Sequence, residues 1–230
     1  MRKTSFLAGL FLLVLTAAGQ AEDAKPFISN ADVDLTAILP PPPANDSATT
    51  KAELAEVLTL QLTRTPEMEA RAKADAEENV WRFADVMGPK FTKEALPKLN
   101  AFFERVVATE GAVVDPAKDV WKRPRPHMLS DLVKPIVKPS TSGSWPSGHT
   151  TLGTMMGIVL SDMVPEKRTE IMTRAWEYGH NRVVAGIHYP SDIEMGRISG
   201  AVIASNLQHN AEFEAEYAAA KAELRADLGM

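Results

Sequence analysis

The 230-residue sequence contains no cysteine, so its folded state must rest on buried apolar surface rather than on disulfide bonds. After the N-terminal region it has no run of 18 apolar residues, which argues against a membrane-spanning helix there. The loop pattern Gly-x4-Gly-Lys is absent, so nucleotide hydrolysis by that route is not supported. Positive charge is not in excess, since 25 lysines and arginines stand against 30 acidic residues, and binding to nucleic acid is not expected.

The N-terminus has the pattern of a secretory signal peptide. Arg2 and Lys3 precede a short apolar run, and small residues follow up to Ala21. This pattern predicts a signal peptide over residues 1–21 and a mature protein that is periplasmic or secreted, with no membrane association after cleavage. The alternative is an N-terminal membrane anchor, for which the apolar run is short. Cleavage removes two basic residues and no acidic one, so the formal charge falls from −5 to −7 and any cationic pocket must be local.

Residues 22–50 show little helical periodicity and contain four consecutive prolines, Pro40–Pro43, directly after Ile38 and Leu39. Proline fixes φ and favours the polyproline II conformation, so this segment is predicted as an extended, proline-rich arm. Two placements stay open for it. It is either a mobile tail or an arm packed on the main domain, where Ile38 and Leu39 would be covered.

From residue 51 onward, apolar residues recur at helical spacing nearly throughout. Leu99, Phe102 and Val106 show the i, i+3, i+7 pattern of an amphipathic helix, and the alternation typical of strands is scarce. The sequence therefore predicts an all-α fold, with a single-domain helical bundle over residues 51–230. Glycines four residues apart, such as Gly153 and Gly157, indicate places where two helices approach closely.

Several helix ends are also marked in the sequence. Thr65-Pro66 is a typical helix start, because proline is favoured at the first helical position. Gly88 is expected to end a helical run, and a further helix is expected over residues 166–185. Ser191–Glu194 has the form of a capping box that opens the next helix, and residues 210–228 are predicted as a solvated amphipathic helix.

Three short blocks carry the residues suited to chemistry. The first contains Lys118 and Arg125, with a proline on each side of Arg125. A guanidinium group matches two phosphate oxygens at once, and a lysine adds a point charge. Taken alone, each cation would be interpreted as a surface charge, but stiff prolines suit fixed positioning better than a mobile surface. Lys122 and Arg123 either tune this pocket or face water.

The second block is Pro146-Ser147-Gly148-His149, which precedes an apolar helical run. A helix N-terminus presents free N–H groups and the positive end of the helix dipole, so it favours anions. Ser147 and Gly148 can aim backbone N–H groups at an oxyanion, and His149 would lie beside it. The simpler interpretation is that Ser147 only caps the helix and His149 is a surface histidine.

The third block contains Arg182, His188 and Asp192. A carboxylate four residues from a histidine can keep one imidazole nitrogen protonated and orient the other as a nucleophile. The alternative is that Asp192 only interacts with the helix dipole. The other histidines have no such partner and are predicted to be non-catalytic: His127, His180 and His209.

Two histidines and a carboxylate are also a known set of metal ligands. Here, however, Lys118, Arg125 and Arg182 would surround the metal ion with like charge. Such a cluster suits an anion, so no metal and no cofactor are predicted.

The order and spacing of these three blocks resemble the type 2 phosphatidic-acid-phosphatase superfamily, and within it the class A bacterial non-specific acid phosphatases, which carry a similar leucine-polyproline segment. The resemblance implies metal-free hydrolysis of small phosphate monoesters through a phosphohistidine, with a broad substrate range and phosphotransferase side activity. It implies that His188 is the nucleophile, His149 the general acid and Asp192 the group that orients His188. The phosphate-binding residues that it implies are Lys118, Arg125, Ser147, Gly148 and Arg182.

The sequence departs from the family pattern at Asn181, where serine is usual before the arginine of the third block. This leaves the contact at that edge and the substrate preference open. An acidic pH optimum is expected because His149 must carry its proton. Two other functions stay open: a vanadate-dependent haloperoxidase, which shares this site pattern in usually larger chains, and a non-catalytic phosphate-binding protein. The residues around Trp81, Trp121 or Trp145 are candidates for setting specificity, and a homo-oligomer is left open.

Overall fold

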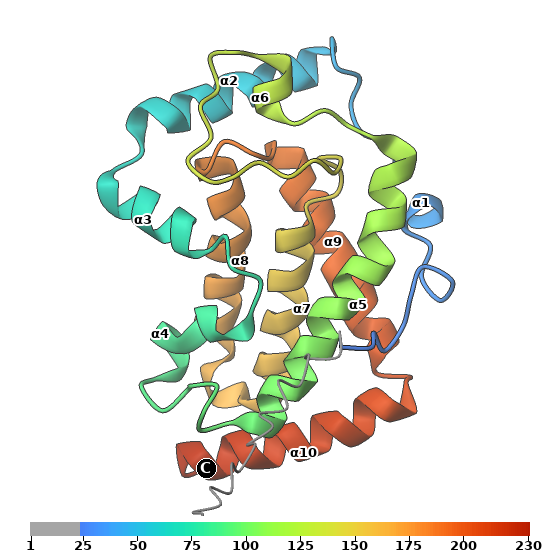
Figure 1. Ribbon diagram of the computed structural model, residues 1–230, viewed down its shortest axis with the longest axis vertical. Helices are drawn as coiled ribbons and strands as arrows, with labels where there is room; N and C mark the ends of the chain where they lie inside the picture. The colour runs from blue at the N-terminus through green and yellow to red at the C-terminus, as the bar shows by residue number, and fades with distance from the viewer. Residues whose placement is uncertain (1–23) are drawn as a thin grey trace, which may run out of the picture.

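The computed structural model describes residues 24–230, and its elements are helices joined by loops (Figure 1). No strand occurs among these residues, which confirms the all-α class. The signal peptide predicted over residues 1–21 lies outside the described residues. In chain order the elements, with η for a 3-10 helix, are α1 (Leu35–Ile38), α2 (Ala48–Thr63), α3 (Pro66–Ala74), η1 (Val80–Phe83), α4 (Ala84–Met87), α5 (Pro97–Trp121), α6 (Pro126–Leu129), α7 (Gly148–Met163), η2 (Pro165–Lys167), α8 (Arg168–Val184), α9 (Pro190–Leu207) and α10 (Ala211–Leu228).

Helix α7 is the centre of the bundle. It packs against α8 and α9, while α5 crosses it and α10 lies across the lower end (Figure 1). A Cβ on Gly153 would fall 2.6 Å from Cδ1 of Tyr178 on α8, and one on Gly200 of α9 would fall 2.6 Å from the carbonyl oxygen of Thr151. The predicted close approach at the spaced glycines is therefore confirmed. Within residues 24–230, no helix combines the length and apolar character needed to cross a bilayer.

The N-terminal arm is packed on the bundle. The backbone N–H of Phe27 donates to Thr109 Oγ1 of α5 at 2.9 Å, and the Phe27 ring packs 5.3 Å from that of Phe213 on α10. Of the two residues before the prolines, Leu39 is buried and Ile38 is about half exposed. The arm also contains the short helix α1, which its weak periodicity did not indicate. Burying one such phenylalanine stabilises the fold by roughly 1.5–3 kcal/mol.

Most of the predicted helix ends are confirmed, and one is wrong. Thr65 caps α3 as expected, and Gly88 ends α4 with a φ of 107°. Helix α9, however, begins at Pro190 rather than at a capping box opened by Ser191. The reason is that proline lacks an N–H and fits the first helical position without loss. This start places Asp192 at the third helical position, where its carboxylate faces back along the chain.

Candidate active site

A cavity of about 430 Å³ lies where the C-terminal part of α5, the N-terminus of α7 and the C-terminal part of α8 come together. The loop before α9 and the loop of residues 137–142 complete its wall. Six of the eight predicted site residues line it: Lys118, Arg125, Gly148, His149, Arg182 and His188. The other two, Ser147 and Asp192, are buried and are not among the lining residues.

His188 lies in the loop between α8 and α9, and both of its ring nitrogens have partners. Nδ1 is 3.2 Å from Oδ2 of Asp192, and Nε2 is 3.0 Å from Nη1 of Arg125. Because a guanidinium can only donate, Nε2 must accept and the ring proton is on Nδ1. The unprotonated Nε2 is therefore the nitrogen with a lone pair to offer.

The surroundings of His188 also keep it neutral. The side chain is 3% exposed, and its burial lowers its pKa well below the usual value. The positive charges of Arg125 and Arg182 lower it further. A histidine in this setting stays unprotonated in mildly acidic solution, where an exposed histidine would be charged.

Asp192 is held by donors from three separate segments. Arg123 Nη1 donates to its Oδ1 at 2.6 Å, the backbone N–H of Tyr189 donates to Oδ2 at 2.8 Å, and the Ser144 hydroxyl also donates to Oδ2. Burial raises the pKa of the Asp192 carboxyl, and Arg123 opposes that shift. The carboxylate that orients His188 is thus itself fixed in place.

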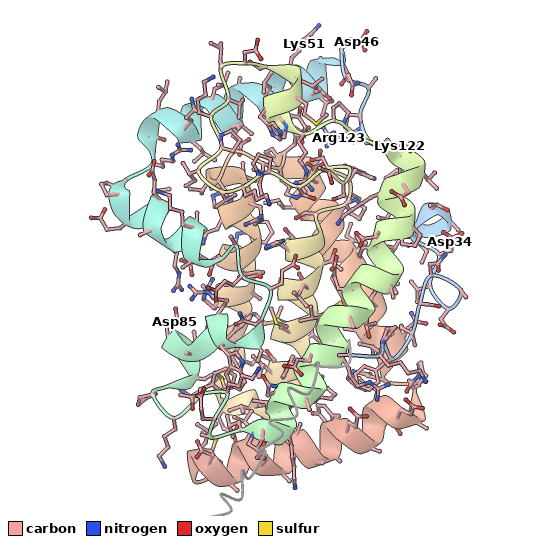
Figure 2. The ribbon with its side chains drawn as sticks, in the orientation of Figure 1. Asp34, Asp46, Lys51, Asp85, Lys122 and Arg123 are labelled. Atoms are coloured by element: carbon pink, nitrogen blue, oxygen red, sulfur yellow. The ribbon has the colours of Figure 1, made fainter. Side chains whose placement is uncertain are left out.

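The sequence left the role of Arg123 undecided, and the structure places it behind the site. Arg123 is buried and bridges Asp192 to Glu53 of α2, whose Oε2 accepts from Nη2 at 2.8 Å. Its neighbour Lys122 is exposed at the end of α5; both are labelled in Figure 2. Glu53 carried no sequence signal, because it is a lone acid on a surface-patterned helix far from the three blocks.

His149 is placed between two hydrogen-bond acceptors. Its Nδ1 is 2.8 Å from Oε1 of Glu78, its Nε2 is 3.0 Å from the carbonyl oxygen of Ala76, and its ring stacks on Tyr178. Only the doubly protonated ring can donate to both acceptors at once. Burial lowers the pKa of His149, and the hydrogen bond to Glu78 opposes that shift. Glu78 lies outside every sequence block and was not predicted.

The cations that face the cavity differ in how far they are already paired. Arg182 is buried, and its Nε and Nη1 have no hydrogen-bond partner. Burial lowers its pKa to about 10, so it remains charged in acidic and neutral solution. Arg125 donates to the carbonyl oxygens of Ser142 and Ile187 at 3.0 and 3.1 Å, and Lys118 Nζ is 3.1 Å from Asp115. An anion in the cavity would meet Arg182 with most of its donors unused.

The N-terminus of α7 is tied to that of α9. Ser147 is the N-cap of α7, its Oγ accepts from Thr150 N at 3.3 Å, and its backbone N–H donates to the carbonyl oxygen of Asp192 at 3.0 Å. Gly148 faces the cavity, and a side chain at this position would displace Lys118, since a Cβ there would lie 2.8 Å from Lys118 Nζ. Phosphate contacts of Ser147 and Gly148 stay predictions.

Asn181 is directed away from the cavity. Its Nδ2 donates at 2.7 Å to Asp75, a buried carboxylate that also pairs with Arg82 and Arg174. The residue that departs from the family pattern therefore belongs to a neighbouring ionic cluster. Within residues 24–230, no group of three histidine, aspartate or glutamate side chains is arranged to hold a metal ion.

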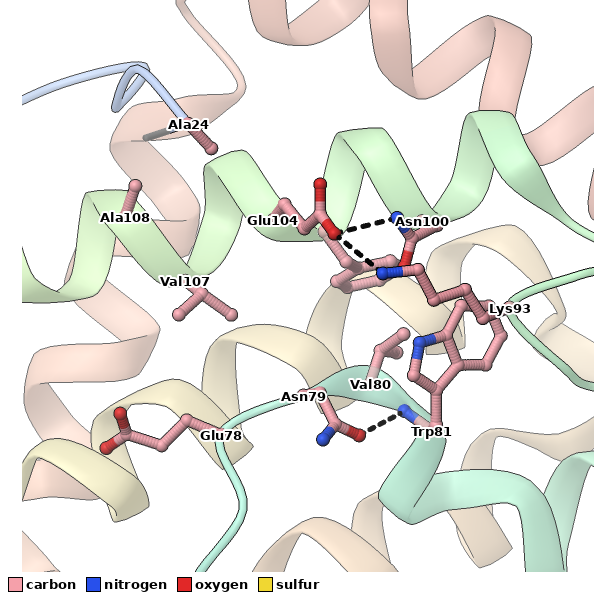
Figure 3. A pocket seen from close by; sticks show the side chains of 11 residues that line it. Ala24, Glu78, Asn79, Val80, Trp81, Lys93, Asn100, Glu104, Val107 and Ala108 are labelled. Carbon is pink, nitrogen blue, oxygen red and sulfur yellow. Dashed lines mark hydrogen bonds and ion pairs between the residues drawn. The ribbon is translucent and has the colours of Figure 1, made fainter. Parts of the chain in front are cut away.

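A second cavity, of about 570 Å³, shares Glu78 with the first. Figure 3 shows the residues that line this second cavity, Glu78 among them. Its wall includes the apolar side chains of Val80, Trp81 and Val107, with Lys93 and Glu104 at the other end. Trp81 therefore lines a cavity next to the site. The other two tryptophans considered from the sequence, Trp121 and Trp145, pack edge to face on one another and line neither cavity.

The chain is similar in sequence to known proteins. The family model described as PAP2 superfamily matches residues 104–211. A non-specific acid phosphatase from Salmonella typhimurium is 31% identical over 232 residues, which cover 96% of this chain and 93% of the relative. The chain belongs to the PAP2 superfamily. A further relative, a non-specific acid phosphatase from Providencia stuartii, is 29% identical over 95% of both chains.

Solved structures show the same fold at lower identity. A bacterial vanadium-dependent iodoperoxidase superposes with a TM-score of 0.55 at 22% identity, over 74% of this chain and 52% of the peroxidase chain. A transmembrane PAP2-type phosphatidylglycerolphosphate phosphatase from Bacillus subtilis gives a TM-score of 0.51 at 16% identity, over 79% of this chain and 94% of its own. These likenesses establish the PAP2 fold and nothing about substrate.

Proposed function

We propose that this protein is a secreted acid phosphatase, which hydrolyses phosphate monoesters by a metal-free phosphohistidine mechanism. The observation that carries the proposal is the state of His188: a neutral, buried imidazole with an unprotonated Nε2, on a cavity that is also lined by Arg182, a cation with unpaired donors. A nucleophile and an oxyanion cradle on one small cavity are the two requirements of phosphoryl transfer.

In the first half of the reaction, Arg182, Lys118 and the N-terminus of α7 hold the phosphate group and take up its negative charge. His188 Nε2 attacks phosphorus in line with the leaving oxygen, so that the N–P bond forms as the ester P–O bond breaks. Arg125 moves its Nη1 donor from Nε2 to a phosphate oxygen. Protonated His149 keeps its Nδ1 contact with Glu78 and transfers its Nε2 proton from the carbonyl oxygen of Ala76 to the departing alcohol, which leaves neutral.

In the second half, His149 acts as the base. It takes a proton from water as the water oxygen attacks phosphorus, the N–P bond breaks, and phosphate is released while His188 is restored. Glu78 stabilises the imidazolium that forms at His149, and Asp192 keeps the proton on Nδ1 of His188 throughout. When another alcohol takes the place of water, the same step becomes phosphotransfer.

The second cavity supports a broad substrate range. The leaving group departs on the side of His149. Glu78, the partner of His149, also lines the second cavity, so that cavity lies next to the leaving group (Figure 3). The apolar wall of this cavity suits the carbon skeleton of an ester without fixing one chemical structure, because the polar side chains Lys93, Asn100 and Glu104 are already paired with one another. Export to the periplasm or the medium follows from the signal-peptide pattern of residues 1–21.

The test is hydrolysis of p-nitrophenyl phosphate at about pH 5.5 in excess EDTA, comparing the wild type with His188→Ala. Activity that survives chelation and falls at least ~10⁴-fold in the variant is expected for a histidine nucleophile without a metal. Loss of wild-type activity in EDTA would contradict the metal-free mechanism. If the vanadate-loaded protein oxidised halide with peroxide and showed no phosphatase activity, the protein would be a haloperoxidase and the proposal would be wrong.

A further inference from the structure

Glu110 is a buried carboxyl that the mechanism above does not use. It lies within α5, is 6% exposed, and its Oε1 is buried without a hydrogen-bond partner. A buried carboxylate without donors is unfavourable, because ionisation removes it from water with nothing in return. Burial therefore favours the neutral acid form of Glu110. A buried acid without a partner at this position calls for a functional explanation.

That place is immediately behind the phosphate cradle. The position that a Cβ on Gly148 would occupy is 2.6 Å from Glu110 Oε1 and 2.8 Å from Lys118 Nζ, so both groups approach the same point at the start of α7. Lys118 Nζ itself is directed to Asp115, on the solvent side, at 3.1 Å. A small rotation of the Lys118 side chain would bring its ammonium group to Glu110 instead.

The charged groups around Glu110 come from two segments. Lys118 and Asp115 share its helix, and Glu78 approaches from the segment before η1, while the N-terminus of α7 contributes its dipole at Gly148. Burial, with the negative charges of Glu78 and Asp115, raises the pKa of Glu110 to about 7, although Lys118 opposes this. The neutral acid is then the main form in acidic solution, and the carboxylate appears as the solution becomes alkaline.

We propose that Glu110 is a positioning residue that confines tight phosphate binding to acidic solution by acting through Lys118. As the neutral acid, it leaves the Lys118 ammonium free to meet the phosphate. As the carboxylate, it draws Lys118 back and adds a negative charge behind Gly148, which repels the bound oxyanion. The inference deepens the proposed function, on which its biological meaning rests, and gives the acid preference a cause separate from His149.

The decisive comparison is phosphate binding by wild type and Glu110→Gln, measured by titration calorimetry with inorganic phosphate at about pH 5 and about pH 8.5. Glutamine keeps the shape and a permanent neutral donor, and the ratio of the two dissociation constants cancels the titration of phosphate itself. The ratio is expected near one at the lower pH, where Glu110 is neutral, and the wild type is expected to bind about tenfold more weakly at the higher pH, where the carboxylate is the main form. A ratio that is the same at both pH values would overturn the proposal.

Two further variants test whether Glu110 acts through Lys118 or only through its charge. Asp115→Asn removes a carboxylate that contacts the same lysine from solvent; because Glu110 still ionises in this variant, phosphate binding is expected to weaken at the higher pH as it does in the wild type. In a Lys118→Gln background, the gain from Glu110→Gln at the higher pH is expected to shrink below about threefold, because coupled residues are not additive. An undiminished gain there would exclude Lys118 as the intermediary.

A measurement on the wild type alone avoids any variant that folds poorly. The Glu110 carboxyl carbon can be titrated by NMR in glutamate-labelled protein, with and without saturating phosphate. By linkage, phosphate must raise this pKa by the same factor by which ionisation weakens phosphate binding, so a rise of about one unit is expected. An unchanged pKa would refute the inference. Calorimetry and NMR need no turnover, so a protein that binds phosphate in this way yet hydrolyses no ester would contradict only the proposed function.

Discussion

The two catalytic histidines of the proposed mechanism lie in the same cavity but in opposite kinds of surroundings. His188 and its partner Asp192 are 3% and 0% exposed, whereas the side chains of His149 and its partner Glu78 are 15% and 43% exposed. The first pair is held by hydrogen bonds from three separate loop residues, Arg123, Ser144 and Tyr189. The second depends on one short loop that supplies both of its acceptors.

This difference matches the two tasks. A nucleophile must keep one protonation state, and burial among cations lowers the pKa of His188 in the direction that keeps it neutral. A general acid must gain and lose a proton in every turnover. Glu78, a partly exposed carboxylate, can balance that changing charge: it pairs with His149 when the ring is protonated, and water solvates it when the ring is neutral. The variants below test whether the contrast is real, in order of expected effect.

Arg123→Met tests the buried His188–Asp192 pair. It leaves the buried Asp192 carboxylate without its cation, which is expected to lower kcat/KM by about 100-fold or more and to reduce the free energy of unfolding by roughly 3–5 kcal/mol. Enzyme kinetics and urea denaturation measure the two effects. Lys122→Met, at the exposed neighbouring position, is the matched control and should change neither. Equal effects of the two variants would mean that the Asp192 support is not special.

Glu78→Gln tests the partly exposed His149–Glu78 pair. Since the Glu78 carboxylate raises the pKa of His149, its removal should lower that pKa, so the protonated form is lost at lower pH. The alkaline limb of the kcat profile is then expected to move down by up to about one pH unit, an effect of up to tenfold near neutral pH and little below about pH 5. Glu77→Gln, at the exposed preceding residue, serves as the control. An unmoved alkaline limb would exclude Glu78 from the proton transfer.

Val107→Phe fills the second cavity without touching either histidine. It is expected to raise KM for p-nitrophenyl phosphate about fivefold while leaving KM for a small alkyl phosphate within about twofold, because only the larger leaving group needs that space. Steady-state kinetics on the two esters provides the measurement. A parallel change for both substrates would show that the leaving group lies elsewhere.

Asn181→Ser should have the smallest effect. Since the Asn181 amide serves the buried Asp75 cluster, its loss is expected to reduce the free energy of unfolding by about 1 kcal/mol and to change kcat/KM less than about twofold. Denaturation and p-nitrophenyl phosphate kinetics check both values. A large kinetic effect without a change in stability would show that Asn181 acts on the bound phosphate and not only on the Asp75 cluster.

What could be predicted from the sequence follows from how local each signal is. Thr65-Pro66 starts a helix because of contacts within a few residues, and the glycine spacing on α7 and α9 reports packing by its own periodicity. The capping box is formed by Tyr189 and Asp192 and not by Ser191 and Glu194, because Pro190 takes the first helical position. Residues with adjacent motifs could be grouped into a site before their geometry was known.

The unforeseen residues have the opposite character. Glu53, Glu78 and Glu110 are acids without a motif, and only tertiary packing places them beside or behind the site. On the page, an acid among 30 such residues is indistinguishable from a solvated surface charge. Their roles depend on burial and on distances to partners that no local pattern contains. The same is true of Arg123, whose neighbour Lys122 has the same charge and the opposite exposure.

The hydrogen bond from the Ser147 backbone to the Asp192 carbonyl has a consequence for anyone who wishes to move this chemistry to another protein. It fastens the start of the helix that cradles the anion to the start of the helix that orients the nucleophile. The smallest transferable unit is therefore a pair of helix beginnings in fixed mutual orientation, and not a set of eight side chains. A scaffold chosen for such a graft should be searched first for two helices that open against one another at this separation.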